Sequence, residues 1–217
     1  MAETIPRADT TTRTAERALT LLSVVCENGP VTLGEAARSA DLSSSTALRL
    51  LRTLESTNFV RRDEDGSYRP GATIVQLGVL ALSQESLVSL CRDPMMRIVE
   101  QTGESAYLSV PAPERQGLYI AIIEGTHSVR HANWVGRKFP VESSASGSVL
   151  NGHVGQYGYS VVSDGVERDV TAIAAPIRVG ERTVGALSVV VPSYRITPEA
   201  IARIGGLLVN ETHTLYI

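Results

Sequence analysis

Apolar residues recur at two different spacings along this chain. Over residues 14–83 they fall mainly three and four positions apart, which predicts helices. From residue 105 onward several segments alternate between apolar and polar positions, as strands do. The first helical stripe covers residues 14–27 and stops at 28–30, an Asn-Gly-Pro helix breaker. The spacing therefore predicts a mainly helical beginning and a sheet-rich second half.

Two short helices joined by a tight turn are predicted between residues 32 and 56. Thr32 and Glu35 have the spacing of a capping box, in which each side chain accepts a hydrogen bond from the other residue's amide. Residues 40–42 are short enough to be the turn, and Ser43 is a good N-cap for the second helix. This order of elements predicts a helix-turn-helix.

The second of these helices has an apolar face and a polar face. At about 100° per residue, the apolar face holds Ala47, Leu50, Leu51 and Leu54. The polar positions that we predict to contact DNA are Ser43, Ser44, Ser45, Thr46, Arg49 and Arg52. In a major groove, Ser and Thr can bond to several bases and Arg can bond bidentately to guanine, so Arg49 is the best single candidate. An ordinary solvated helix face is the alternative.

A basic hairpin is predicted directly after this helix. Two strand-like segments flank a glycine-containing turn at residues 63–66. Arg61 and Arg62 in the first segment, with Arg69 in the second, would meet phosphates, which position a protein without reading sequence. The three acidic residues of the turn would be repelled by phosphates. The tip of this wing is therefore expected to stay off the DNA backbone.

Residues 73–83 are predicted to form a helix that is apolar nearly all round. Leu77, Gly78 and Ala81 belong to one of its two apolar stripes, and such a helix needs burial on two sides. The expected second partner is the same helix of another subunit, which would pair two DNA-binding units across a palindromic site. Burial under the chain's own domains is the alternative.

The remainder of the chain predicts an α+β domain built on an antiparallel sheet. Helices are predicted over residues 87–101 and after Thr197-Pro198, where Thr is a suitable N-cap and Pro fits the first turn. Strand-like runs between them cover residues 105–110, 118–124, 129–134, 159–163, 171–177 and 183–191.

Composition restricts the classes of function. The 217 residues carry a formal net charge of −3, so any affinity for DNA must come from a local basic surface. Cys26 and Cys91 lie on apolar helical patterns, which predicts buried thiols in a reducing compartment. No signal peptide, membrane-spanning run, phosphate-binding loop or nucleophile motif is recognisable. We expect a cytoplasmic protein that is not an enzyme, needs no cofactor and does not contact a membrane.

Two histidines are candidates for metal binding. His127 and His131 lie four positions apart, which would place them on one face of a strand. Without nearby Cys residues or a carboxylate pair, this spacing favours polar or pocket-lining side chains over a metal site.

Taken in order, these segments resemble the IclR-type transcriptional regulators. In the N-terminal part the resemblance rests on residues 17–19 (Arg-Ala-Leu), 42–51 (Leu-Ser-Ser-Ser-Thr-Ala-Leu-Arg-Leu-Leu), 68–71 (Tyr-Arg-Pro-Gly) and 77–78 (Leu-Gly). Landmarks similar to those of the family's effector domain follow at residues 102–106, 135–140, 145–147, 158–160, 173–176 and 186–189. The resemblance covers roughly residues 13–210.

The resemblance implies a winged helix-turn-helix, a linker helix and a C-terminal GAF/profilin-like domain with an antiparallel sheet and flanking helices. The boundaries expected for these parts are 1–12 for a flexible arm, 13–71 for the DNA-binding domain, 72–85 for the linker helix and 86–217 for the effector-binding and oligomerisation domain.

By the same resemblance, small effectors bind between the sheet and an Ala-Ser-Gly loop, where backbone amides hold an acidic group. The positions carried over are Ala145 and Ser146 as amide donors, His131 and Phe139 in the wall, and Val162, Ala172, Ser188 and Val190 on strands. Val162 and Val190 replace polar groups found in some relatives, which predicts a more apolar cavity. Ser188 fits equally well as a strand residue bonded to a neighbour.

The chain departs from the family pattern at two places. Ser44 stands where the family usually has Lys, which removes one phosphate contact. Only seven residues separate Leu150 from Gly158, whereas the family has roughly forty there, commonly folded as helices beside the cavity. Either the effector domain is abbreviated or a stretch has been omitted from the chain.

The sequence thus predicts a homodimeric or homotetrameric regulator that binds a double-stranded DNA operator and senses a small organic effector, such as a carboxylate. A regulator whose shortened C-terminal domain only oligomerises is the alternative, and a small-molecule enzyme of the sensor-domain class is a more distant one. The effector, the operator and the choice between repressor and activator stay open.

Overall fold

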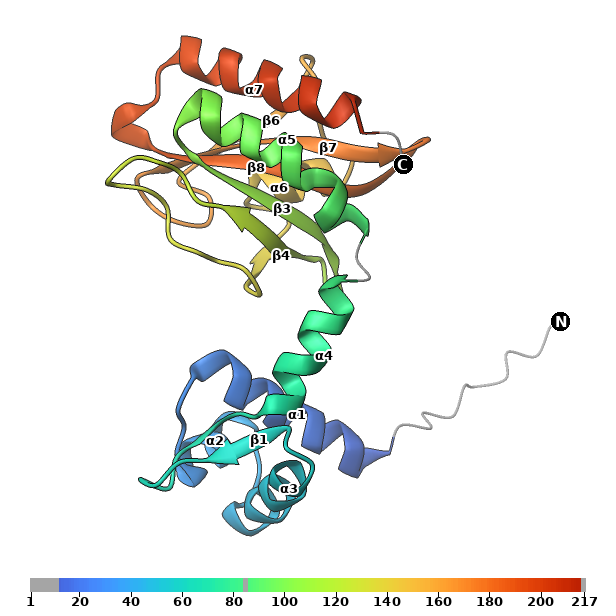
Figure 1. Ribbon diagram of the computed structural model, residues 1–217, viewed down its shortest axis with the longest axis vertical. Coiled ribbons are helices and arrows are strands. Elements are labelled where there is room, and N and C mark those ends of the chain that lie inside the picture. Colours follow the sequence, from blue (N-terminus) through green and yellow to red (C-terminus); the bar gives the residue numbers. More distant parts are fainter. Residues whose placement is uncertain (1–11, 84–85, 216–217) are drawn as a thin grey trace, which may run out of the picture. The chain divides into compact units, whose positions relative to one another are not determined.

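The chain folds into two compact units, which comprise residues 1–84 and 85–217. The computed structural model describes residues 12–83 and 86–215 (Figure 1). The predicted arm therefore lies outside the described residues, except for Thr12. In the described ranges, no helix is long and apolar enough to cross a membrane.

The first unit opens with helices whose starts are set by side-chain caps. These helices are α1 (Arg13–Asn28), α2 (Leu33–Ser39) and α3 (Ser44–Ser56). The predicted capping box of α2 is confirmed, because the Glu35 amide donates to the Thr32 hydroxyl at 3.3 Å and the Thr32 amide donates to the Glu35 carboxylate at 2.9 Å. The Ser43 hydroxyl accepts from the Thr46 amide at the start of α3. The helix-turn-helix forms where these caps predict it.

A hairpin and a further helix complete the first unit. They are β1 (Val60–Arg62), β2 (Tyr68–Pro70) and α4 (Ala72–Ser83). The buried ring of Tyr68 joins the hydrophobic core formed by α1, α2 and α3. After β2 the chain passes so close to the end of α3 that a Cβ at Gly71 would lie 2.2 Å from the carbonyl oxygen of Asn58. A larger residue at position 71 would push the hairpin away from the helices.

The described strands of the second unit form one antiparallel sheet, in the order β5-β4-β3-β8-β7-β6. They are β3 (Ser105–Ala112), β4 (Gln116–Ile123), β5 (Lys138–Pro140), β6 (Ser160–Ser163), β7 (Val170–Val179) and β8 (Arg182–Pro192). At the centre, Tyr107 of β3 pairs with Ser188 of β8. The predicted α+β class with an antiparallel sheet is confirmed.

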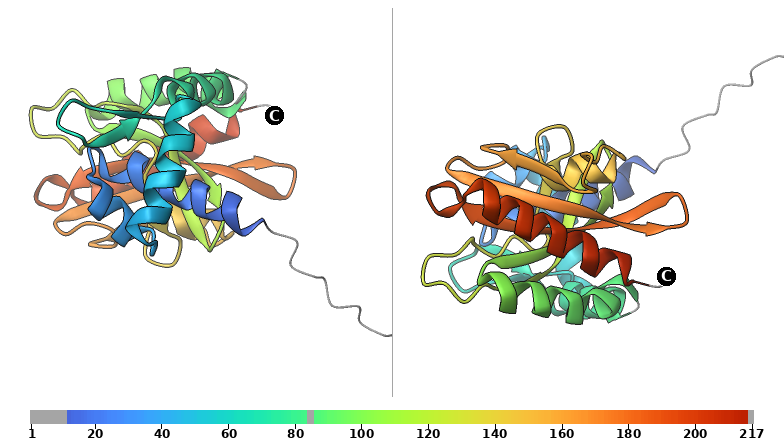
Figure 2. Two further views of the ribbon diagram at one scale, coloured as in Figure 1. Left: turned by 90° about the horizontal axis from the view of Figure 1, so that it is seen from below. Right: turned by 90° about the horizontal axis from the view of Figure 1, so that it is seen from above.

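Different helices cover the two faces of this sheet (Figure 2). They are α5 (Ser86–Thr102) and α7 (Pro198–His213) on one face and α6 (Ala145–Leu150) on the other. Successive strand side chains point to opposite faces. Leu108 and Leu187 therefore join the core under α5 and α7, whereas Tyr107 belongs to a separate cluster on the other face.

Two predictions of secondary structure in the second unit are wrong. The strand predicted at residues 129–134 does not form, and the segment between β4 and β5 is an irregular loop whose Ala132 carbonyl bonds to the Tyr107 hydroxyl instead of to a neighbouring strand. The predicted Ala-Ser-Gly loop is the first turn of α6, because the Ser144 hydroxyl caps the Gly147 amide at 3.0 Å. The short strand β5 was not predicted.

The prediction that both cysteines are buried is half wrong. Cys91 lies on α5 and joins the core between this helix and the sheet, where burial raises the pKa of its thiol to about 12. Cys26 is exposed on α1. It lies one position beyond Val25, which faces the core, so the rotation of about 100° per residue turns its side chain outward.

Candidate nucleic-acid interface and effector pocket

The exposed face of α3 carries three of the side chains predicted to read DNA. Its opposite face is buried through Ala47, Leu50, Leu51 and Leu54. The exposed face forms a shallow hollow lined by Ser45, Leu48, Arg49, Arg52, Thr53 and Ser56. Ser45, Arg49 and Arg52 thus share one surface, as the helical spacing predicted.

Hydroxyl groups at the start of α3 are engaged in capping. The Ser43 hydroxyl donates to the Thr46 hydroxyl at 2.9 Å and lies 3.2 Å from the Ser45 hydroxyl. Ser44 is exposed beside them. Ser43 and Thr46 therefore have a structural role in this helix end, and their predicted DNA contacts, like those of Ser44 and Ser45, stay predictions.

The arginines of the hairpin differ in how far the chain neutralises them. Arg69 forms an ion pair with Asp63, and Arg61 lies 3.8 Å from the same carboxylate. The guanidinium of Arg62 sits over the Tyr68 ring, 5.7 Å from its centroid. Arg61 and Arg62 are exposed, whereas Arg69 is half-buried. The ion pair with Asp63 makes Arg69 the poorest phosphate contact of the three.

In the second unit, a pocket opens on the sheet face that α6 covers. Strand residues, the β4–β5 loop, the start of α6 and the β6–β7 loop meet around it. The lining residues are Tyr119, His131, Trp134, Ser143, Ser144, Ala145, Ser146, Val162, Gly165, Val166, Glu167, Val170, Ala172 and Val190. Segments that are distant in the sequence thus form one wall.

This pocket is small and largely apolar. Its cavity volume is about 30 Å³, far below the roughly 300 to 1,000 Å³ typical of small-molecule sites. The rings of Tyr119 and Trp134, with centroids 6.0 Å apart, form an aromatic wall.

His131 connects the pocket to the sheet beneath it and to the loop opposite. Its Nδ1 lies 2.7 Å from the Tyr107 hydroxyl, and its Nε2 lies 3.0 Å from Oε2 of Glu167. Burial lowers the pKa of His131, while the hydrogen bond and the charge of Glu167 act in the opposite direction. The lowered pKa favours a neutral imidazole. Because the carboxylate only accepts, Nε2–H donates to Glu167 and Nδ1 accepts from the Tyr107 hydroxyl, whose single proton is then shared with the Ala132 carbonyl.

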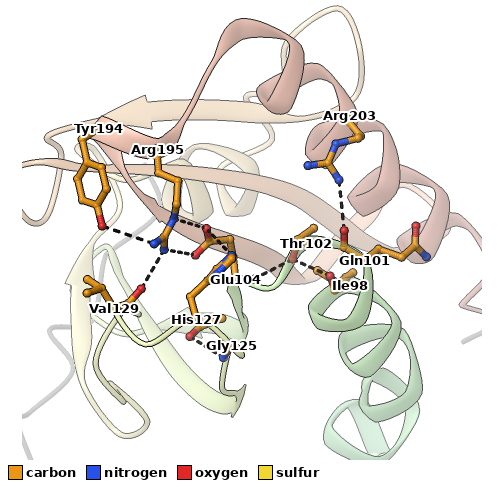
Figure 3. A network of polar contacts seen from close by, with 11 residues as sticks. Ile98, Gln101, Thr102, Glu104, Gly125, His127, Val129, Tyr194, Arg195 and Arg203 are labelled. Carbon is orange, nitrogen blue, oxygen red and sulfur yellow. Dashed lines mark hydrogen bonds and ion pairs between the residues drawn. The ribbon is translucent and has the colours of Figure 1, made fainter.

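The β4–β5 loop, which carries part of the pocket wall, is anchored by a buried ion pair (Figure 3). Arg195, in the 3-10 turn η1 (Ser193–Arg195), donates from Nε and Nη2 to the two carboxylate oxygens of Glu104, each at 2.9 Å. The same Nη2 donates to the Val129 carbonyl at 2.9 Å. His127 adds a contact, with Nε2 3.6 Å from Oε1 of Glu104. The start of the loop is thereby fastened to the ends of α5 and β8.

The structure brings six of the eight predicted effector-site residues to this pocket: His131, Ala145, Ser146, Val162, Ala172 and Val190. Phe139 and Ser188 do not line it. Phe139 is buried behind Tyr119, with ring centroids 4.5 Å apart. Ser188 is fully buried, and its hydroxyl has no hydrogen-bond partner among the described residues.

Sequence reasoning missed Tyr119, Trp134 and Glu167 as pocket residues. Tyr119 lies in the strand predicted at residues 118–124, but the side of the sheet that it faces follows from its pairing with Ser109, which the structure shows. Trp134 and Glu167 lie in loops, whose paths leave no periodic signal.

A short connection joins α6 to β6. Residues 151–159 turn back through hydrogen bonds from the Gly158 amide to the Gly155 carbonyl and from the Gly155 amide to the Tyr159 carbonyl. Among the described residues no helix lies between α6 and β6. The pocket therefore has no cover from the additional helices that the family resemblance implied.

The two candidate metal-ligating histidines do not face a common site. His127 approaches Glu104, whereas His131 contacts Tyr107 and Glu167. Within the part of the chain that the structure describes, no group of three or more His, Cys, Asp or Glu side chains could hold a metal ion.

Comparison with known proteins assigns both units to the same family. The IclR helix-turn-helix domain matches residues 14–64, and the C-terminal domain of bacterial IclR transcriptional regulators matches residues 79–155. Together the two matches span more than half of the chain. The chain belongs to the IclR family. The second match ends at Gly155, within the short connection between α6 and β6.

One relative in this family is the transcriptional repressor IclR of Escherichia coli (strain K12). It is 31% identical over 137 residues, which cover 62% of this chain and 50% of the repressor. The chain thus spans about half the length of this relative. The matched relatives are named as transcriptional regulators and not as enzymes.

Solved structures of IclR proteins share the fold. The regulator from Alicyclobacillus acidocaldarius has a TM-score of 0.80 at 22% identity, with 94% of this chain and 98% of that chain covered. An IclR homolog from Microbacterium hydrocarbonoxydans, complexed with 4-hydroxybenzoate, has a TM-score of 0.71 at 21% identity, with 92% and 99% covered.

Proposed function

We propose that this IclR-family chain is a sequence-specific DNA-binding transcriptional regulator whose C-terminal unit senses a small organic effector. The observation that carries the proposal is the division of α3 into a buried leucine-rich face and an exposed face with Ser45, Arg49 and Arg52. Because the chain spans about half the length of the E. coli relative, the activity of that protein is not assigned to this chain.

DNA recognition would divide between α3 and the hairpin. With α3 in the major groove, the Arg49 guanidinium can donate to O6 and N7 of one guanine, a contact that distinguishes base pairs. Arg61 and Arg62 are exposed at the hairpin and would contact phosphates, which set the position of the protein on the duplex.

The pocket supports binding of a small organic acid. Ser143, Ser146 and Tyr119 bring hydroxyl groups to its lining, and the amides of Ala145 and Ser146 lie in the first turn of α6, where amides have no acceptor within the helix. The relative from M. hydrocarbonoxydans was crystallised with 4-hydroxybenzoate, which is an aromatic acid. The predicted carboxylate effector is therefore part of this proposal.

Regulation requires two linked sites and a symmetric assembly. An effector changes DNA affinity only if it binds the DNA-competent and the incompetent arrangements unequally. A homodimer formed through α4 would place two copies of α3 on the two halves of a palindromic operator. Exposed apolar side chains on α4, including Val75 and Leu77, support this part of the proposal.

The DNA-binding role is tested by substituting the principal base-reading candidate. Arg49→Ala should lose about 1 to 3 kcal/mol of discrimination between operator and unrelated DNA, measured by mobility-shift titration on DNA flanking the protein's own gene. Arg178→Ala, which removes an exposed arginine from β7 in the other unit, is the control for net charge. Unchanged operator discrimination in Arg49→Ala would contradict the assignment.

The sensing role is tested by titrating the protein with small carboxylates and repeating the operator titration with any compound that binds. We expect calorimetric binding and a changed operator affinity with at least one acid. No heat and no shift in melting temperature with any of them would favour the alternative function, in which the C-terminal unit only assembles subunits.

A further inference from the structure

The hairpin that follows α3 carries as many acidic side chains as basic ones. Three arginines lie on its strands, and three acidic residues, 63–65, lie in its turn. The formal charges of residues 60–70 therefore cancel. Affinity for the DNA backbone comes from cations that neutralise phosphates. Which arginine is available to a phosphate thus depends on where each carboxylate of the turn points.

Asp63 lies between two arginines that face each other across the hairpin. Arg61 of β1 pairs directly with Arg69 of β2, an arrangement of like charges that is unfavourable by itself. The Asp63 amide donates to the Ser67 carbonyl at 2.8 Å, so the pairing continues past β1. The Asp63 carboxylate forms an ion pair with Nε of Arg69 and lies 3.8 Å from Nε of Arg61. One carboxylate therefore serves both cations.

The two arginines depend on Asp63 to different degrees. Nε of Arg69 is buried and makes no hydrogen bond with a described residue, so the charge of Asp63 is what compensates it. The Arg69 side chain is nevertheless 43% exposed, which leaves room for its guanidinium to turn to a phosphate once it is released. Arg61 is 63% exposed and more distant from the carboxylate. Asp63 thus holds Arg69 back and leaves Arg61 accessible.

The other two acids of the turn have different surroundings. Asp65 accepts hydrogen bonds from the amide and the hydroxyl of Ser67, at 2.9 and 2.6 Å. Glu64 is exposed and forms no ion pair with a described residue. Glu64 is therefore a matched reference for Asp63, because it carries the same charge one position further along without contacting an arginine.

We infer that Asp63 withholds Arg69 from DNA phosphates and thereby limits the sequence-independent part of the DNA affinity. The inference rests on the proposed DNA-binding function, since it concerns the same surface. A phosphate contact stabilises operator and unrelated DNA alike, because it carries no sequence information. Arg69 would have to give up its ion pair with Asp63 to make such a contact, which offsets the gain. Asp63 is thus a positioning residue that acts on DNA through Arg69.

The experiment is mobility-shift titration of the full chain at salt concentrations from about 50 to 200 mM. The probes are DNA flanking the protein's own gene and an unrelated duplex of equal length. Asp63→Asn, which keeps the shape and loses the charge, should bind both probes more tightly and by the same factor. Its plot of log affinity against log salt should be steeper by about 0.9, the value for one added phosphate contact. Affinity should therefore fall about three- to fourfold further over this range than in the wild type.

Two variants separate the release of Arg69 from a general effect of charge. Glu64→Gln removes a negative charge from the neighbouring position and should leave the slope of the wild type unchanged. The double variant Asp63→Asn/Arg69→Ala should return to the wild-type slope, because the added contact needs the Arg69 guanidinium. A purely structural role of Asp63 would lower the melting temperature without making the salt dependence steeper.

The other outcomes contradict the inference. An unchanged slope in Asp63→Asn, an equal steepening in Glu64→Gln, or a steepening that persists in the double variant each overturns it and leaves the DNA-binding function standing. If the wild type binds the two probes equally, sequence-specific binding fails while the slopes still test Asp63, and if it binds neither probe, both proposals fail. If Asp63→Asn melts at a lower temperature, Arg61→Gln/Asp63→Asn relieves the facing charges, and its slope compared with that of Arg61→Gln decides.

Discussion

Arg195 holds the carboxylate of Glu104 at two points, through Nε and Nη2, each 2.9 Å from a different carboxylate oxygen. Glu104 is only 3% exposed, so its charge is removed from water and depends on this partner. A further hydrogen bond of the arginine, to the Val129 carbonyl, extends the pair into the loop that carries the pocket wall. Stability of the fold and position of the loop are therefore linked through one side chain.

Replacing this arginine should be costly, because it would leave the buried Glu104 carboxylate with only the more distant contact to His127. We expect Arg195→Met to lower the free energy of unfolding of the second unit by about 3 kcal/mol. Urea unfolding followed by the fluorescence of Trp134, the only tryptophan of the chain, measures this change. Arg130→Met is the matched control, because it breaks a solvent-exposed pair with Glu124 and should cost no more than about 1 kcal/mol. Equally small losses in both variants would show that the Glu104 pair contributes little.

The buried imidazole of His131 should make stability depend on pH. Burial lowers its pKa in the folded chain, so the unfolded chain binds more protons between that lowered value and the ordinary value of about 6.5. The contribution of His131 is therefore complete above about pH 6.5 and is lost as the pH falls through this window. Glu167, which accepts from Nε2, opposes the shift, whereas Arg137 adds to it.

The test of this pH dependence is urea unfolding at several pH values from about 7 downward to about 5, starting above the ordinary histidine pKa of about 6.5. His131→Asn should lose less stability over this range than the wild type. His153→Asn controls for the removal of an exposed imidazole outside the pocket. If the free energy of unfolding falls with pH equally in His131→Asn and in the wild type, the prediction is contradicted.

The exposed apolar side chains of α4 predict that this helix joins subunits. Val75 is 63% exposed and Leu77 is 48% exposed. Leu77→Glu would place a charge in the proposed seam, and unpaired charges are costly to bury. We expect the mass of Leu77→Glu, measured by light scattering at low micromolar concentration, to fall. The comparison is Gln76→Glu, which adds the same charge at an exposed neighbouring position of α4. An unchanged mass for Leu77→Glu would mean that another surface holds the subunits together.

Ser188 is expected to behave as a core residue and not as a ligand contact. Its hydroxyl is buried beside Tyr107 without a hydrogen-bond partner among the described residues. Deleting a buried, unpaired hydroxyl removes a desolvation penalty, so Ser188→Ala should leave stability unchanged or raise it by up to about 1 kcal/mol. Thermal unfolding measures the stability of Ser188→Ala, and calorimetry measures whether its affinity for the effector stays the same. Loss of effector affinity without loss of stability would return Ser188 to the binding site.

Local interactions made the first unit predictable from the sequence. The Thr32–Glu35 capping box, the Ser43 cap and the apolar face of α3 involve residues at most a few positions apart, so the pattern contains the whole interaction. The same is true of the cap at Thr197, whose hydroxyl accepts from the Ala200 amide. Helix starts and buried faces could therefore be assigned before any fold was known.

The sequence by itself thus determined most helices and strands, the two faces of α3 and, through family landmarks, six of the positions around the pocket. Only the tertiary structure decided that Trp134 and Glu167 join that pocket and that Phe139 and Ser188 lie outside it. It also replaced the strand predicted at residues 129–134 with a loop held by Tyr107 and Arg195. The physical reason is that a loop takes its path from contacts with distant residues, which leave no period in the sequence.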